Sequence, residues 1–143
     1  MNKKINIITF TDPMMGLSYE SEPVFRKLET HFGENIEFKY LMCVLVKDVY
    51  DLVNQEDLSE SKELAIKNYN AKLAKIYEIE EYISNMPINM TDFHLFSIEH
   101  TSSLPLKLAY KSVQLVDKSK ADLFLYNLRY ATIVAACRPT TQA

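Results

Sequence analysis

The order of apolar and polar residues predicts a strand, a helix and a second strand within the first 46 residues. Residues 5–10 are mainly β-branched and aromatic and are followed by Asp12-Pro13, which is typical of a buried strand that ends in a turn. Apolar residues recur at helical spacing over about residues 15–32, where Pro23 is expected to kink or split the helix. Residues 36–46 alternate and then become wholly apolar, which predicts the second strand.

The rest of the chain has helical periodicity. Asp57-Leu58-Ser59-Glu60 has the form of a capping box and predicts the start of a long helix that Pro87 ends. Residues 85–98 show neither the helical nor the strand spacing of apolar residues and are expected to form an irregular connection. Ser103-Leu104-Pro105 and Ser119-Lys120 each predict the start of a further helix.

These elements together predict an α/β fold, in which a β-α-β unit is followed by helices. A β-α-β unit implies parallel strands and a right-handed crossover. The pattern contains no third strand, and a two-stranded sheet is marginal by itself. We therefore expect helices or a second copy of the chain to cover the strand edges, and we predict a homodimer.

Composition narrows the classes of function. The 143 residues, 48% apolar and 24% charged, suit one ordered domain. A net charge of −3 argues against a nucleic-acid-binding surface, and no run approaches the roughly 20 apolar residues of a membrane span. Two distant cysteines, Cys43 and Cys137, form neither a CxxC nor a zinc pattern, so a reducing cytoplasm is the simplest setting.

Several residues with reactive or aromatic side chains have ordinary interpretations. His94 and His100 are six residues apart, which fits no metal-ligand motif, and we expect neither a metal nor a cofactor. Cys43 is either a lone reactive thiol or, as we favour, an inert core residue. The tyrosines of the long helix, Tyr77 and Tyr82 among them, are expected to pack in the core.

Three separated segments resemble the DsbA-like branch of the thioredoxin superfamily. Residues 12–28, DPMMGLSYESEPVFRKL, are similar to the segment in which a family strand ends in Asp-Pro, a C-x-x-C-aromatic motif begins the helix, and an E-P-hydrophobic-x-[KR]-Leu stretch continues it. Residues 37–46 resemble the family's second strand, and residues 103–109 resemble its helical insertion. The resemblance implies one DsbA-like domain, with the thioredoxin half over residues 1–50 and the helical insertion over residues 51–143.

The sequence departs from the family at the redox motif. Alignment on Asp12-Pro13 places Met15 at the nucleophilic cysteine and Ser18 at the resolving cysteine. A thioether has no proton to lose and cannot form a mixed disulfide. The family's last strands, with a cis-proline loop, would follow residue 143, which implies either the N-terminal part of a longer protein or a natural half-domain.

The resemblance therefore implies a redox-degenerate protein that binds a peptide or protein partner at the former active-site face. The former motif, Met15, Gly16, Leu17 and Ser18, is expected to start a helix whose free N–H groups could hold a peptide, a carboxylate or a glutathione-like ligand. The alternative is an ordinary capped helix with Ser18 as a surface hydroxyl. Met14 and Met15 are expected to be exposed at this motif, where flexible side chains suit contacts with partners. For the six methionines taken together, however, we favour a role as gap-filling core residues. The alternative function is a protein-disulfide oxidoreductase or a glutathione-transferase-like enzyme of the same superfamily, seen as a fragment.

Overall fold

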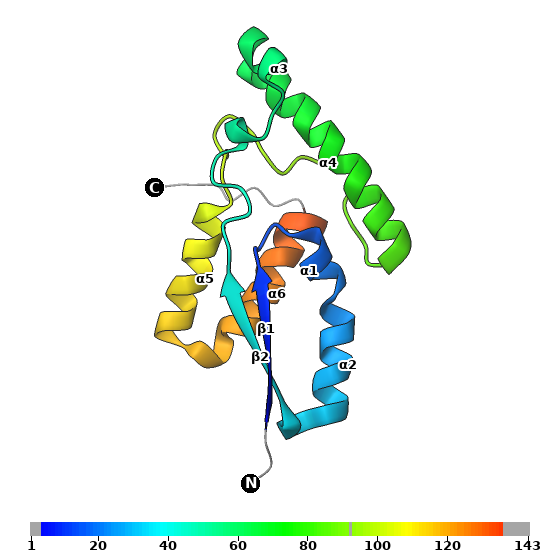
Figure 1. Cartoon of the computed structure of the whole chain (residues 1–143), viewed down its shortest axis with the longest axis vertical. Helices are drawn as coiled ribbons and strands as arrows, with labels where there is room; N and C mark the ends of the chain where they lie inside the picture. Colours follow the sequence, from blue (N-terminus) through cyan, green and yellow to red (C-terminus); the bar gives the residue numbers. More distant parts are fainter. Residues whose placement is uncertain (1–3, 92, 136–143) are drawn as a thin grey trace.

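The computed structural model describes residues 4–91 and 93–135. The elements follow the order β1 (Ile5–Thr11), α1 (Gly16–Glu20), α2 (Glu22–Phe32), β2 (Ile36–Met42), α3 (Gln55–Glu60), α4 (Lys62–Ser84), α5 (Leu104–Val116), α6 (Ala121–Arg129) and a π-helical turn (Tyr130–Val134). Three short 3-10 turns lie at Gly33–Asn35, Val49–Asp51 and Lys118–Lys120. Figure 1 shows α3 and α4 beyond the carboxyl ends of the strands, whereas α2, α5 and α6 lie alongside the sheet.

The two strands pair in parallel, as the β-α-β pattern predicts. Ile5 lies opposite Ile36 and Thr11 opposite Met42. The second strand ends at Met42, so the predicted extension to Val46 is wrong. The chain leaves the sheet there because both backbone groups of Val46 bond Ser103, just before α5: the Val46 carbonyl accepts the Ser103 N–H at 3.0 Å, and the Val46 N–H donates to the Ser103 hydroxyl at 3.4 Å.

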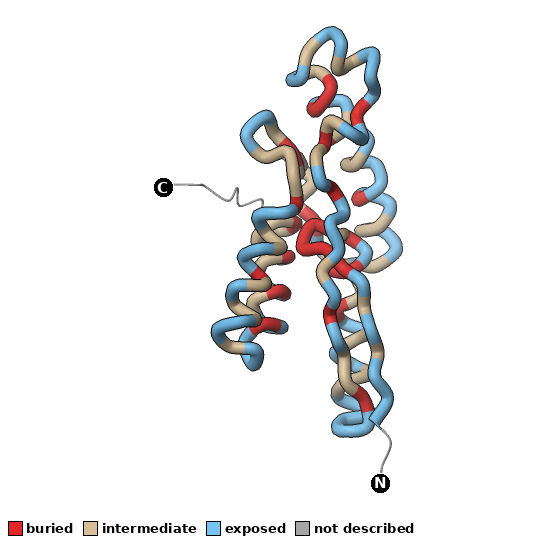
Figure 2. The backbone as a smooth tube through the Cα atoms, turned by 60° about the vertical axis from the view of Figure 1, so that its left-hand side comes forward, coloured by how far each residue is buried: buried red, intermediate tan, exposed pale blue. Residues whose placement is uncertain are grey.

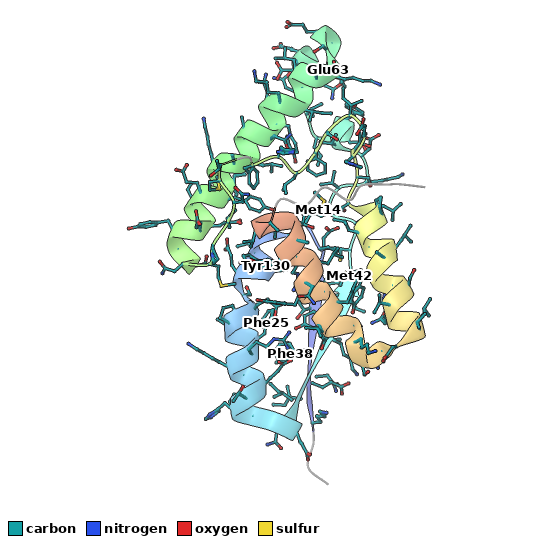
Figure 3. The ribbon with its side chains drawn as sticks, turned by 180° about the vertical axis from the view of Figure 1, so that it is seen from behind. Met14, Phe25, Phe38, Met42, Glu63 and Tyr130 are labelled. Carbon is teal, nitrogen blue, oxygen red and sulfur yellow. The ribbon has the colours of Figure 1, made fainter. Side chains whose placement is uncertain are left out.

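Only one face of this sheet is covered in the described part of the chain. Alternate residues share a face, so Phe38 and Tyr40 point to the side where α2 and α6 pack; the rings of Phe25 and Phe38 lie 5.1 Å apart (Figure 3). On the opposite face Ile8, Phe10 and Leu41 are 55%, 66% and 44% exposed. The paired strands accordingly show long exposed stretches in Figure 2.

The first helical stretch is divided in two, as the position of Pro23 predicts. The helix α1 ends at Glu20, where both the N–H and the hydroxyl of Ser21 donate to the Leu17 carbonyl. Pro23 lies in the first turn of α2, where its missing N–H removes no helical hydrogen bond.

The helical half differs from the prediction at its start. The expected capping box at residues 57–60 is wrong, because these residues lie inside α3. The side chain of Asn54 caps α3, and the hydroxyl of Ser61 caps α4 by accepting the Leu64 N–H at 3.0 Å. α4 ends at Ser84, three residues before Pro87.

The later helices follow the prediction closely. Residues 85–91 and 93–98 contain neither helix nor strand, as expected. Ser103 precedes α5 and Pro105 lies in its first turn. The last helix begins at Ala121, after a 3-10 turn that includes Ser119. No helix in the described residues is long and apolar enough to cross a bilayer.

The core of the described residues is divided into three clusters, and each of them joins the thioredoxin half to the helical half. Met14 is 5% exposed, so the expectation that it lies on the surface is wrong. It packs in the first cluster with Val46, Val49, Val53, Ala65, Ile66 and Phe96. In the second cluster Tyr77 of α4 packs near Tyr19 of α1. Tyr77 is thus a core residue as predicted, but Tyr82 is 86% exposed, so core packing is wrong for that residue.

Candidate functional site

The turn after β1 is fixed by a buried carboxylate. Asp12 is 1% exposed. One of its oxygens accepts the Met14 N–H at 2.9 Å, and the other accepts the Leu45 N–H at 3.1 Å and the Ser103 hydroxyl at 2.7 Å. A single side chain therefore ties the turn to the segment after β2 and to the start of α5, and it holds the following residues in place.

Residues 15–18, which we call the corner, are covered by α4. The Tyr77 hydroxyl donates to the Met14 carbonyl at 2.6 Å and accepts the Gly16 N–H at 3.2 Å. The N–H groups of Ser18 and Tyr19 donate to the Met15 carbonyl. The expected set of free N–H groups is therefore largely used within the protein.

Gly16 is required at the corner by the close approach of α4. A Cβ atom at this position would lie 2.4 Å from a Glu80 carboxylate oxygen and 2.9 Å from the Tyr77 ring. Any larger side chain would require the Glu80 side chain and the Tyr77 ring to move. The glycine therefore serves packing between the two halves of the chain.

Two carboxyl groups, Glu20 and Glu80, lie near the corner and oppose the binding of an anion. Burial and the charge of Glu80 raise the pKa of Glu20 to about 7. Burial also raises the pKa of Glu80. One oxygen of each, Glu20 Oε1 and Glu80 Oε2, is buried without a hydrogen-bond partner among the described residues. The electrostatics of the corner thus differ from the anion-friendly helix start that the sequence predicts.

A chain of hydrogen bonds leads from α6 to the two positions of the former motif. Arg129 Nη2 donates to Thr11 Oγ1 at 2.6 Å, Thr11 Oγ1 donates to Ser18 Oγ at 2.8 Å, and Ser18 Oγ donates to Met15 Sδ at 3.1 Å. Ser18 is 7% exposed, so its interpretation as a surface hydroxyl is wrong. Its proton is held by the thioether, and none of these partners is a base that could activate it.

Arg129 anchors this chain through a buried ion pair. The guanidinium is 0% exposed and donates to the carboxylate of Glu22, which is 4% exposed. Arg26 also approaches Glu22, at 3.4 Å. Sequence reasoning did not identify Arg129, although a lone arginine four residues after Leu125, on the apolar face of a helix, is a usable signal.

Cys43 lies beside the corner rather than in the core. Its N–H donates to the Thr11 carbonyl at 2.8 Å, and its thiol is exposed and free, so the favoured interpretation as a core residue is wrong. Leu17, Val44 and Leu45, near the same end of the sheet, are 56%, 39% and 50% exposed. Cys137 lies outside the described residues.

The two histidines considered in the sequence line one cavity. His94 and His100 lie, with Glu63 and Glu99, around a space of about 620 Å³ between α4 and the segment that follows it. Within residues 4–91 and 93–135, no three His, Cys, Asp or Glu side chains are grouped so that they could hold a metal ion.

The fold and a comparison with known families agree. The family model described as Thioredoxin matches residues 8–141. The chain belongs to the thioredoxin family. Within this family, the β-α-β unit followed by inserted helices is the DsbA-like arrangement that the sequence predicts.

A solved structure supports the fold of this thioredoxin-family chain. It is the crystal structure of a "putative protein disulfide isomerase" from Nitrosomonas europaea, with a TM-score of 0.65 and 14% identity. The match covers 94% of this chain and 57% of the other, so the chain spans less than two thirds of that protein. No curated protein matches the chain.

Proposed function

We propose that this thioredoxin-family chain is redox-inactive at its corner and binds a peptide or protein partner at the former active-site face. The observation that carries the proposal is the Ser18 Oγ–Met15 Sδ hydrogen bond of 3.1 Å at the two motif positions. Disulfide exchange requires a thiolate that attacks sulfur, and neither side chain can supply one.

The exposed apolar residues around the corner support the binding of a partner. Leu17, Val44 and Leu45 are exposed, and the flexible side chain of Met15 lies half-buried next to Leu17. Exposed apolar groups gathered at one end of a sheet are typical of contact surfaces, and methionine adapts to partners of different shape.

The redox part of the proposal is tested by insulin reduction with dithiothreitol as electron source. The chain is expected to show no turnover above background. The double variant Met15→Cys/Ser18→Cys is the matched positive control, because it restores both thiols on the same backbone. Turnover by the unmodified chain, with Met15 in place, would overturn the proposal.

The binding part is tested with an alkylated insulin B chain, which is a peptide without redox chemistry. Fluorescence anisotropy of the labelled peptide is expected to show saturable binding that Leu17→Asp and Leu45→Asp weaken at least tenfold. The control Ile79→Asp changes a residue of α4 that is 61% exposed, and it should leave binding unchanged. Equal binding by all variants would contradict a site at the corner.

An enzyme of the same family, seen as a fragment, is the alternative function. Among the described residues a protein-disulfide oxidoreductase could use the exposed thiol of Cys43, and turnover that Cys43→Ser abolishes would favour it. A glutathione-transferase-like activity would need glutathione at the corner, where Glu20 and Glu80 oppose its carboxylates. A titration with glutathione, monitored through the backbone amide shifts of residues 15–18, separates this alternative from the binding protein.

The free thiol of Cys43 and the absence of a CxxC motif favour a cytoplasmic location.

The uncovered face of the sheet supports self-association in addition. We propose a homodimer in which Ile8, Phe10 and Leu41 of two copies pack together, because these side chains are 55%, 66% and 44% exposed. Sedimentation at micromolar concentration should give a dimeric mass that Phe10→Asp reduces to a monomeric one. A monomeric mass for the unmodified chain would exclude this dimer.

A further inference from the structure

The outer edge of β2 opens into a groove that is separate from the corner. Residues 36–41 of β2 form one wall, Tyr110, Lys111 and Gln114 of α5 form the other, and the space between them is about 490 Å³. Figure 1 shows α5 on the side of β2 that faces away from β1. The groove therefore follows the free edge of a strand along nearly its whole length.

This edge offers backbone hydrogen-bonding groups to an incoming strand. β2 pairs only with β1 in the described residues, so its second edge carries no strand. In a parallel pair, alternate residues of each strand direct their N–H and C=O groups away from the partner. An extended peptide can add to such an edge through main-chain hydrogen bonds, and a helix opposite the edge then contacts its side chains.

The inner side of the groove is formed by core residues of β2, α5 and α6. Tyr40, Tyr110 and Ala121 are 7%, 1% and 3% exposed and form one core cluster. The apolar side chains of an occupant can therefore pack against this cluster.

The charges of the groove favour an acidic occupant. Lys39 and Lys118 line it and form no ion pair with any described residue, and Lys111 donates only to the Gln114 side chain at 2.7 Å. Two of the acidic groups that line it have cations of their own: Glu37 lies 4.0 Å from Lys4, and Glu29 lies 2.9 Å from Arg26. Burial raises the pKa of the third, Asp122, which favours its uncharged form.

We propose that an extended peptide segment, in which acidic and apolar residues alternate, binds in this groove as a strand beside β2. Its apolar side chains pack toward Tyr110 and Ala121, and its carboxylates face Lys39 and Lys118. The proposal does not depend on the corner, because the two surfaces share no residue.

The test uses a labelled, end-capped six-residue peptide in which glutamate alternates with valine. Fluorescence anisotropy with the full chain is expected to show saturable binding, at least tenfold weaker when lysine replaces glutamate in the peptide. Lys39→Glu/Lys118→Glu should weaken binding at least tenfold without loss of folding. Lys72→Glu, at an exposed lysine of α4 outside the groove, is the matched control and should have no effect.

Strand addition has a signature that simple electrostatic attraction lacks. In a bound strand, alternate N–H groups of the peptide face β2 and the others face away. Methylation of the nitrogens that face β2 should abolish binding, whereas methylation of the others should preserve it. Equal effects of both registers, or binding that the groove variants leave unchanged, would overturn the proposal. Leu17→Asp, a change at the corner, should preserve binding of this peptide. The groove proposal and the corner proposal can therefore fail independently of each other.

Discussion

Removal of the Arg129 guanidinium should destabilise the chain more than any surface change. Arg129→Met leaves Glu22, which is 4% exposed, as a buried carboxylate whose one remaining cation is the half-exposed Arg26 at 3.4 Å, and it leaves Thr11 without its donor. Removing one member of a buried ion pair costs about 3–5 kcal/mol. With a urea dependence of about 2 kcal/mol per molar, the unfolding midpoint should fall by about 2 M.

The matched control changes the exposed member of the same cluster. Arg26 is 46% exposed, and Arg26→Met should cost less than about 1 kcal/mol, because exposed ion pairs contribute little. The double variant Glu22→Leu/Arg129→Met should recover much of the loss, since it leaves no unpaired charge. If Arg129→Met does not fold, Arg129→Lys keeps the charge and allows the comparison. A loss below 1 kcal/mol for Arg129→Met, or strictly additive effects in the double variant, would refute this reasoning.

Three further measurements test the contacts of the corner. Tyr77→Phe removes both hydrogen bonds between α4 and the corner and should lower the free energy of unfolding by about 2 kcal/mol. The control Tyr82→Phe, at a ring that is 86% exposed, should leave the free energy of unfolding unchanged. Equal urea midpoints for the two variants would contradict this. The free energy of unfolding should fall as pH rises from 4.5 to about 7, because the raised pKa of Glu20 lets the folded chain keep a proton that the unfolded chain has lost. Solvent screening limits this effect to on the order of 1 kcal/mol, and Glu20→Gln should reduce it to the part that the raised pKa of Glu80 contributes; an identical pH profile in the variant would exclude Glu20 as a cause. The Cys43 thiol should react with an aromatic disulfide reagent in the native chain almost as fast as in urea, and Cys43→Ser should remove this fast phase; protection until unfolding would show that the thiol is buried.

The sequence predicts well those features that nearby residues determine. The two strands, their parallel pairing and the division of the first helix at Pro23 follow from short patterns and from the fixed backbone angle of proline. The capping box at residues 57–60 was wrong for a local reason as well. The residues that do cap helices, Asn54 and Ser61, lie on either side of it. Within this short stretch several Asn, Asp and Ser side chains are suitable caps, and the pattern alone does not decide between them.

The remaining errors come from contacts between distant residues. The predicted strand is too long because Ser103, 57 residues beyond Val46, takes the backbone groups of Val46. The N–H groups of the corner are less available than predicted because Tyr77 reaches Gly16 from 61 residues away. Arg129 lies 118 residues from Thr11, so no local pattern connects them.

The direction of the hydrogen bonds at the corner leads to a last prediction. Donation runs from Arg129 through Thr11 and Ser18 and ends on the sulfur of Met15, which has no proton to pass on. If a thiol replaced the thioether, the same donors would stabilise its anionic form, since hydrogen bonds to a charged group favour that form. Met15→Cys should therefore have a thiol pKa below the usual value of about 8.5, measured from the pH dependence of alkylation in a Cys43→Ser background.

The control for this prediction removes the last donor alone. Met15→Cys/Ser18→Ala should raise the thiol pKa by about one unit relative to Met15→Cys, because the anion then loses one direct hydrogen bond. The carboxyl groups of Glu20 and Glu80 act in the opposite direction, and Glu20→Gln should lower the pKa in both backgrounds. If the pKa is the same with and without the Ser18 hydroxyl, the chain of donors does not act on this position. The corner would then be inactive for two reasons, the missing thiol and the lack of any means to ionise one.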